Sequence, residues 1–437
     1  MTRLQHFGWF LARGFGPQGW GYPSLEWDYD WTRPEIYQEA ARTLEQAGFD
    51  LVIIEDAPSL GSPATIDLRV RHAFGGPKHD PLLLAPSLFH ATRHLGVVPT
   101  VNPAAYLPYT AARQFATLQH LSGHRLGLNV VTDTGSARHF SDAPQLGHDE
   151  AYDRAEEWLA GIRALWHSWD DGALVEDRET DVYADGTRMR AVRHRGDHYR
   201  FDGPLNALPF TQGEPAIVSP GGSERGLGFA GANSDVQLAL APLDEASVRA
   251  YRAKVHEAAI AKGRRPEDVT ILFAIQPVIT ASPEEADRIV AASAHPDDAA
   301  LVQIARKQSS DLETDLTALD LDRPLDLEVF GAHVSRGSIQ RLIGDRGEDA
   351  PLRAHLSALA RAGRISDRSG FVGTAEEFAD LIQELGEWGN DGVLLWGDFH
   401  PVTLHRTLDE LVPVLRRRGI LRREYADGGL QANLRAF

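Results

Sequence analysis

The stretch IYQEAARTLEQAGFDLVIIED, residues 36–56, decides the fold. Its first half carries apolar residues at helical spacing and ends at Gly48, where a helix C-cap is expected. Its second half, FDLVIIED, is a continuous apolar run of the kind that a strand buried on both faces leaves in a sequence. Since the run LQHFGWFL at residues 4–11 precedes the helix, the segment predicts a β-α-β unit.

The same alternation of apolar runs and amphipathic helical stretches continues along the chain. Eight strands, each followed by a helix, favour a closed parallel (β/α)8 barrel, an α/β TIM-barrel fold. An open doubly wound sheet is the alternative, but open sheets of eight parallel strands are less common. The six further strands are expected at 94–101, 125–132, 215–219, 234–240, 270–277 and 391–397.

Two long segments interrupt this rhythm. We expect one insertion after the fourth strand, at about 168–212, and another between the seventh and eighth strands, at about 280–390. No internal repeat or linker divides the chain, so residues 1–437 are expected to form a single domain. Long excursions in a compact barrel are usually lids, binding elements or oligomer contacts.

Composition excludes several classes of function. The 437 residues include no cysteine, which excludes disulfides, thiolate metal sites and cysteine nucleophiles. The formal net charge of −18 opposes binding to nucleic acids and to anionic membranes. No apolar run is long enough for a membrane span, and the N-terminus does not read as a signal peptide, so a cytoplasmic protein is expected.

In a barrel of this kind, the functional residues follow the carboxyl ends of the strands. Glu55 and Asp56 end the second strand, where a single carboxylate would face the mouth, as a ligand contact or only as a cap. Asn129 lies inside the apolar fourth strand, LGLNVV, where a polar side chain is costly unless it is hydrogen-bonded. A ligand or a buried structural network would satisfy it equally.

A glycine-rich turn and two histidines are further candidates for functional residues at the mouth. Gly221, Gly222 and Ser223 follow the fifth strand, and such a turn suits a phosphate group, although an ordinary tight turn has the same composition. His6 and His148 are expected near the mouth and are the candidates for proton handling. No metal-binding histidine spacing is present, and no metal is expected.

In combination these features resemble a known family. The chain resembles the flavin-dependent monooxygenases related to bacterial luciferase, specifically the nitrilotriacetate and dibenzothiophene-sulfone monooxygenase branch. The resemblance covers nearly the whole chain. Its strongest pieces are AGFDLVIIED (47–56), TRHLGVVPTVN (92–102), YTAARQFATLQHLSGHRLGLNVVT (109–132), HDEAYDRAEEWL (148–159), SPGGSERG (219–226) and DELVPVLRRRGILRREYADGGLQANL (409–434).

The resemblance implies a barrel that binds FMN at its mouth. By position, Asp56, Asn102 and Asn129 would lie beside the isoalloxazine and ribityl parts. His148 and Tyr152 would contact the ribityl-phosphate region, and Gly222 and Ser223 would contact the phosphate; these residues stand here in HDEAYDRAEEWL and SPGGSERG.

The resemblance also implies a reaction. A separate NAD(P)H-dependent flavin reductase would supply FMNH2, and O2 would form a C4a-hydroperoxyflavin that oxidises a small organic substrate. The insertion at 280–390 would act as a lid over the site. A homodimer or homotetramer is expected. Two alternatives remain: a deazaflavin-dependent hydride-transferring oxidoreductase of the same barrel type, and an inactive barrel that only binds a ligand.

Overall fold

A computed structural model gives the fold, and it describes most of the chain. The described residues are 3–11, 30–61, 63, 66–71, 76–132, 136, 139, 146–210, 212–312, 314–330, 339, 342–360, 363–365 and 370–437.

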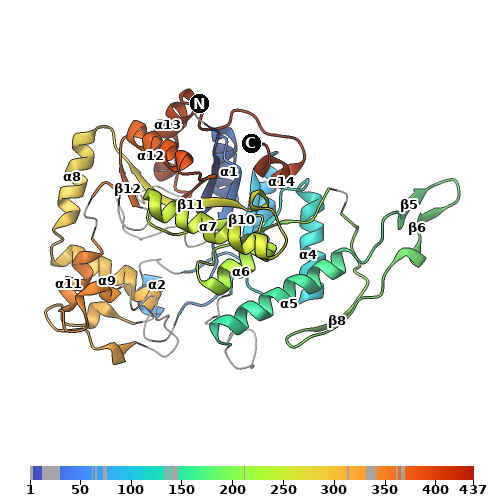
Figure 1. The fold of residues 1–437 in the computed structure, drawn as a ribbon, viewed down its shortest axis with the longest axis horizontal. Coiled ribbons are helices and arrows are strands. Elements are labelled where there is room, and N and C mark those ends of the chain that lie inside the picture. The colour runs from blue at the N-terminus through green and yellow to red at the C-terminus, as the bar shows by residue number, and fades with distance from the viewer. Residues whose placement is uncertain are drawn as a thin grey trace.

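Eight parallel strands close into a barrel, which confirms the predicted fold class (Figure 1). Each strand pairs with its neighbour in chain order, β10 pairs with β11, and β13 pairs with β1 to complete the ring. The barrel strands are β1 (His6–Leu11), β2 (Leu51–Ile54), β3 (Gly96–Val101), β4 (Gly127–Val130), β9 (Ala216–Ser219), β10 (Val236–Ala239), β11 (Thr270–Ile279) and β13 (Gly392–Gly397).

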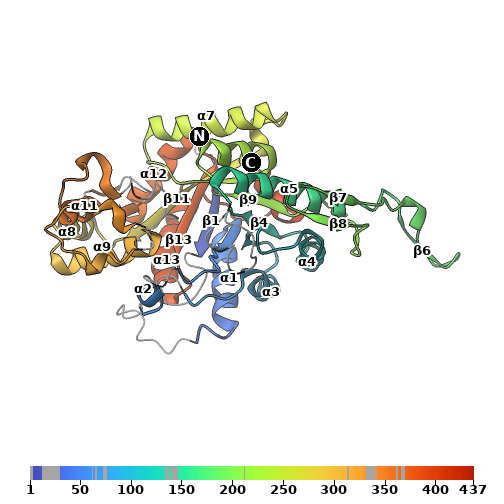
Figure 2. The ribbon, with the colours of Figure 1, turned by 90° about the horizontal axis from the view of Figure 1, so that it is seen from below.

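Helices connect successive strands and cover the outside of the barrel (Figures 1 and 2). The first of them ends at Gly48 as the sequence predicts, because the positive φ of 96° at this residue suits glycine. The connecting helices are α1 (Glu35–Ala47), α2 (Ile66–Arg71), α3 (Pro81–Ala91), α4 (Pro108–Leu121), α5 (His148–Trp166), α6 (Glu224–Asn233), α7 (Glu245–Ala261), α12 (Ala375–Glu387) and α13 (Pro401–Arg417).

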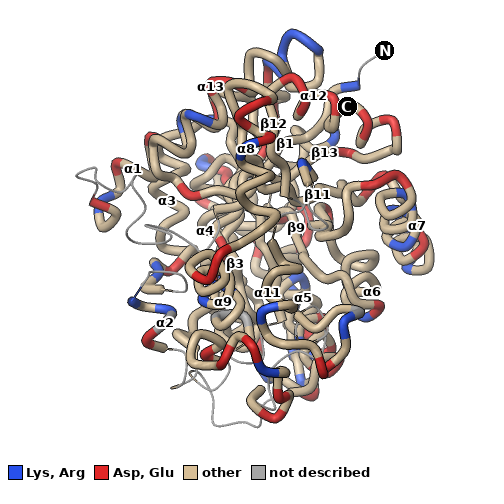
Figure 3. The backbone as a smooth tube through the Cα atoms, turned by 90° about the vertical axis from the view of Figure 1, so that its left-hand side faces the viewer, with Lys and Arg blue, Asp and Glu red and all other residues tan. Residues whose placement is uncertain are grey.

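Side chains alternate between the two faces of the barrel strands. One set, which includes Leu51, Val98 and Leu394, fills the interior, while the other set packs under the helices. Gly8 leaves room in the interior, since a Cβ there would approach Leu394 to 2.7 Å. The C-terminal helix α14 (Gly429–Leu434) contributes Leu430 and closes the amino-terminal end of the barrel. The charged residues lie mostly on the outer helices and loops (Figure 3).

The segment between α5 and β9 forms two hairpins that project from one side of the molecule (Figures 1 and 2). The four strands are β5 (Leu174–Asp177), β6 (Val182–Ala184), β7 (Arg193–Arg195) and β8 (Arg200–Asp202).

The segment between β11 and β13 has a small apolar core of its own. That core includes Leu301, Leu316 and Leu356, and it lies apart from the barrel core. Near its end the chain returns to the barrel through α12, which packs against α13. Its elements before α12 are α8 (Pro283–Ala294), α9 (Asp298–Leu312), α11 (Leu352–Ala358) and β12 (Gly370–Gly373), which pairs with the end of β11.

Within the described ranges, no helix has both the length and the apolar composition that crossing a membrane requires.

Candidate functional site

A polar pair lies on two neighbouring strands at the mouth of the barrel. Asn129 of β4 and Thr100 of β3 are directly paired in the sheet, and both side chains are buried. The Asn129 Nδ2 donates a hydrogen bond of 2.9 Å to the Thr100 Oγ1. The Asn129 Oδ1 is buried without a hydrogen-bond partner among the residues that the structure describes. A buried acceptor of this kind is costly unless a ligand donates to it.

The turn after β9 forms the start of helix α6. Ser223 is the N-cap, and its Oγ accepts a hydrogen bond of 3.1 Å from the Gly226 N–H. Gly221 allows a close approach, since a Cβ there would lie 2.5 Å from the Tyr152 hydroxyl. At Gly222, in contrast, no described atom lies within 4 Å of the position that a Cβ would take. The first turn of a helix has backbone N–H groups without partners inside the helix, and these groups and the helix dipole suit an anion.

Helix α5 brings two of the predicted residues to this turn. His148 is its first residue, and its Nε2 lies 3.3 Å from the Ser223 Oγ, while its Nδ1 lies 2.6 Å from Asp149. Tyr152 follows one turn later. Burial raises the pKa of the Tyr152 phenol, and the nearby Thr132 and Ser223 hydroxyls and Arg225 oppose that shift. The structure thus gathers His148, Tyr152, Gly222 and Ser223 in one place.

A second polar group follows β2. The Lys78 ammonium lies 2.6 Å from the Glu55 carboxylate, and both side chains are largely withdrawn from solvent. Burial raises the pKa of Asp56 to about 7, with a further increase from Glu55 and Asp80, while Lys78 acts in the opposite direction. Burial also raises the pKa of the Tyr106 phenol, as do its neighbours Asp80 and Asp56. The mouth therefore holds a carboxyl that titrates near neutrality.

Asn102 is buried just beyond β3. Its Oδ1 accepts a hydrogen bond of 3.0 Å from the Ala104 N–H, and its backbone carbonyl accepts one of 2.8 Å from Ala105. The side chain therefore stabilises the loop after β3 and, with it, the edge of the mouth.

His6 lies at the opposite end of the barrel, so the expectation that it lies near the mouth is wrong. It is the first residue of β1 and pairs with Gly392, the first residue of β13. Its Nδ1 lies 3.3 Å from the buried carboxylate of Asp50, which also lies 2.5 Å from the Arg422 guanidinium. The His6 ring stacks on Phe437. These contacts give His6 a structural role, since the chemistry of such barrels takes place where the strands end.

The sequence analysis missed three charged residues of the mouth. Lys78 precedes α3, and no pattern links it to Glu55. Arg225, in the first turn of α6, lies over the Tyr152 ring at 5.6 Å and pairs with Asp153 and Glu156 of α5. Asp398 follows β13, and burial raises its pKa. The rule that functional residues follow strand ends would have found Asp398.

Two observations indicate that the site fits FMN. The buried Asn129 Oδ1 is free to accept from a ligand N–H, and the space at Gly222 lies at a helix N-terminus that Ser223 caps. Among the described residues, no three histidine, aspartate or glutamate side chains are grouped so that they could hold a metal ion.

Comparisons with known proteins show the family and the fold. The model of the family described as luciferase-like monooxygenase matches residues 6–392. The chain is 32% identical to the dibenzothiophene-sulfone monooxygenase of Rhodococcus erythropolis (strain XP), with 99% of this chain and 96% of the relative covered. It is 30% identical to the nitrilotriacetate monooxygenase component A of Aminobacter aminovorans, over 97% of this chain and 94% of the relative. A crystal structure of a riboflavin lyase with modified FMN and riboflavin superimposes with a TM-score of 0.80 at 26% identity, covering 100% of this chain and 96% of the other.

Proposed function

Because the chain belongs to the luciferase-like monooxygenase family, we propose that its barrel mouth binds reduced FMN and uses O2 to oxidise a small organic molecule. The relatives of the chain show that it is a flavin-dependent monooxygenase. This result confirms the resemblance seen in the sequence. What we propose concerns the residues that bind the flavin, the class of substrate and the source of the reduced flavin.

The observation that carries the proposal is the convergence at the α6 N-terminus. His148 and Tyr152 from α5 meet Ser223 beside the open space at Gly222. We assign the FMN phosphate to this space, where the backbone N–H groups, the Ser223 hydroxyl and the helix dipole would hold it. Since His148 already faces Ser223, we assign it to the phosphate, where it would also exchange protons with solvent.

The other predicted residues would surround the ring of the cofactor. The Asn129 Oδ1 would accept a hydrogen bond from the flavin, and the Thr100 hydroxyl fixes the orientation of the Asn129 amide. Asp56 would lie beside the ring on the β2 side. Asn102 would stabilise the loop after β3, at the edge of the mouth. When bound, reduced FMN supplies the electrons that O2 activation requires. The residues of this chain would orient the flavin and the substrate and keep the reacting atoms away from bulk water.

We assign the exclusion of water to the helical insertion. Its helix α9 packs against α2, which belongs to the connection after β2. The separate apolar core around Leu301 and Leu356 would let the insertion move as one body. Such movement would admit the substrate and close over it.

We further propose that a separate NAD(P)H:flavin reductase supplies the reduced FMN. The name of the relative from Aminobacter aminovorans, component A, is that of one part of a two-component system. Free reduced flavin reacts quickly with O2, so the site would have to capture it from solution or from the reductase.

The test is a turnover experiment with isotopically labelled oxygen. Chemically reduced FMN is added anaerobically to the protein, and 18O2 is then admitted with a panel of sulfones, thioethers, tertiary amines and alkanes. We expect one 18O atom in the product of at least one substrate, and none when the label is in the water. Catalase in the assay removes hydrogen peroxide that would oxidise the substrate without the enzyme. Turnover with reduced deazaflavin in the absence of O2 would contradict the proposal and support hydride transfer.

A further inference from the structure

A buried glutamine lies in the strand beside the α6 turn. Gln237 is the second residue of β10, and its side chain is fully buried. Its neighbours along the strand, Val236 and Leu238, belong to the apolar interior of the barrel, so the glutamine side chain lies on the opposite face of the sheet. A buried amide is costly unless its hydrogen bonds are formed, so its partners show what it holds in place.

Both ends of the Gln237 amide are hydrogen-bonded. Its Oε1 accepts a hydrogen bond of 2.9 Å from the Ser219 hydroxyl. Its Nε2 donates one of 2.8 Å to the Gly221 carbonyl and one of 2.9 Å to the Tyr251 hydroxyl on α7. A rotated amide would set its oxygen against the Gly221 carbonyl oxygen, so this carbonyl determines the orientation of the amide. The side chain thus connects β9, α7 and the turn that leads into α6.

The carbonyl that Gln237 holds belongs to the peptide group between Gly221 and Gly222. That peptide group is planar and trans, so its N–H, which belongs to Gly222, points away from the carbonyl and from Gln237. No described residue accepts a hydrogen bond from the Gly222 N–H. Gly221 is also close to Tyr152, whose hydroxyl would lie 2.5 Å from a Cβ at that position. The bond from Gln237 therefore fixes the direction of a backbone donor that the fold itself does not use.

We propose that Gln237 is a positioning residue for the flavin phosphate, because it sets the direction of the Gly222 N–H. The inference rests on the proposed function, which assigns the phosphate to the α6 N-terminus. Gln237 acts through the Gly221 carbonyl and needs no contact with the phosphate. Without its bond, the peptide group between the two glycines would be free to rotate, since glycine accepts a wide range of backbone angles. The cost of ordering this peptide group would then weaken each binding event.

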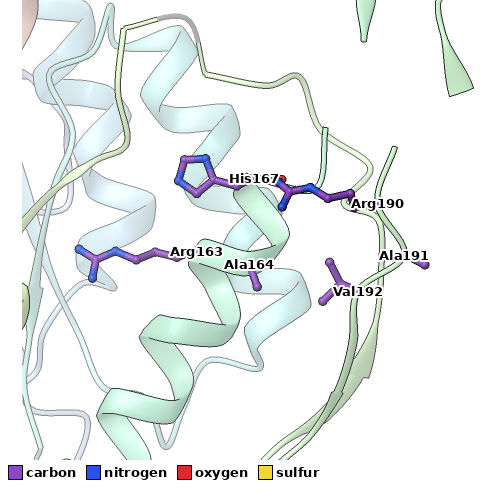
Figure 4. A pocket seen from close by; sticks show the side chains of 6 residues that line it. All are labelled: Arg163, Ala164, His167, Arg190, Ala191 and Val192. Carbon is purple, nitrogen blue, oxygen red and sulfur yellow. The ribbon is translucent and has the colours of Figure 1, made fainter. Parts of the chain in front are cut away.

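A second group of basic side chains, at the far end of α5, is a poorer place for the phosphate. It lines a pocket of about 400 Å³ where the helix ends, beside the chain that leads to β7 (Figure 4). Arg163 pairs there with Glu214 at 3.1 Å. Arg190 pairs with Asp170 at 2.7 Å, so the charge of both arginines is offset, and the dipole at the carboxyl end of a helix opposes an anion. The lining residues are Arg163, Ala164, His167, Arg190, Ala191 and Val192.

The test compares FMN with riboflavin, which lacks the phosphate, in anaerobic titrations with both ligands reduced. Gln237→Met keeps most of the volume of the side chain and removes its hydrogen bonds. It should weaken FMN binding about tenfold and leave riboflavin binding within about twofold of wild type, because only the phosphate contacts depend on the Gly222 N–H. A residue that only stabilises the fold would not distinguish the two ligands.

Two controls separate positioning from stability. Tyr251→Phe removes one hydrogen bond of Gln237 and leaves the bond to Gly221 intact, so it should lower the melting temperature and keep the wild-type preference for FMN. Arg190→Gln alters the pocket at the end of α5 and should keep this preference as well. If Tyr251→Phe lost the preference as strongly as Gln237→Met, the role assigned to the Gly221 bond would be contradicted.

Gln237→Asn provides a second variant in case Gln237→Met does not fold. Its amide remains polar, but it is one methylene too short to reach the Gly221 carbonyl in the same way, so the preference for FMN should fall here too. Equal affinity of the wild type for FMN and riboflavin would overturn the phosphate assignment itself. A wild-type preference for FMN that persists in either Gln237 variant, or an equal loss for both ligands, would overturn the inference alone.

Discussion

Asn129 donates its side-chain amide to the Thr100 hydroxyl over 2.9 Å, while its own Oδ1 is buried and unpartnered among the described residues. The first contact fixes the orientation of the side-chain amide, and the second leaves its acceptor oxygen unsatisfied. Leaving a buried acceptor unsatisfied costs about 1–3 kcal/mol. The arrangement is therefore easier to explain as a binding site than as a structural network.

The first prediction concerns this acceptor. Asn129→Ala should weaken the binding of reduced FMN about tenfold, since one hydrogen bond to the flavin is lost. Anaerobic fluorescence titration measures the dissociation constant. Asn206→Ala, at an exposed asparagine between α5 and β9, is the matched control and should bind FMN normally. An unchanged affinity in Asn129→Ala would mean that Asn129 serves only the fold.

The second prediction separates the cap of α6 from the phosphate site. Ser223→Asp should keep the helix stable, because aspartate is as good an N-cap as serine and suits the helix dipole. The added carboxylate should repel the phosphate and weaken FMN binding about a hundredfold, with much less effect on riboflavin, which has no phosphate. Comparing the two ligands by titration is the measurement. Equal losses for FMN and riboflavin would place the phosphate elsewhere.

The third prediction concerns Asp56, whose pKa burial raises to about 7. Between the ordinary pKa of aspartate and this value, the folded state holds a proton that the unfolded state has released, so stability from this group falls as pH rises. Asp56→Asn imitates the protonated form. It should raise the melting temperature most at pH 8, less at pH 5.5, and hardly at all below pH 4. Asp181→Asn, at an exposed carboxylate, should show no such trend; a uniform effect of Asp56→Asn at all pH values would contradict the shift.

The fourth prediction concerns the amino-terminal end of the barrel. Arg422→Met leaves the buried Asp50 carboxylate without its guanidinium, which lies 2.5 Å away in the native protein. Breaking a buried ion pair typically costs about 3–5 kcal/mol. Urea unfolding should show that loss, while the affinity for FMN should stay unchanged. Arg423→Met, at the exposed neighbouring residue, should change neither quantity; a large effect of Arg422→Met on FMN affinity would mean that the two ends of the barrel are coupled.

The sequence predicted the barrel because strands buried on both faces leave continuous apolar runs. FDLVIIED and RLGLNVVT are such runs, and each contains the strand that the structure shows at β2 and β4. It also predicted the grouping at the α6 turn, where the resemblance named His148, Tyr152 and Ser223. The error at His6 was avoidable, because this residue begins its strand and the active end of a barrel is where the strands finish.

Other contacts could not be predicted from periodicity. Lys78 and Glu55 are far apart in the sequence, and their contact depends on tertiary structure that no periodicity reports. The hydrogen bond between Asn129 and Thr100 depends on the register between β3 and β4. That register cannot be predicted from the sequence of either strand alone.

An anaerobic titration of the wild-type protein with reduced FMN, reduced riboflavin and reduced deazaflavin tests the central claim most directly. We predict one saturable site per chain for reduced FMN, with riboflavin at least about tenfold weaker because the phosphate contacts at the α6 N-terminus are missing. Preference for the deazaflavin, or equal affinity for FMN and riboflavin, would contradict the assignment of the mouth as an FMN site.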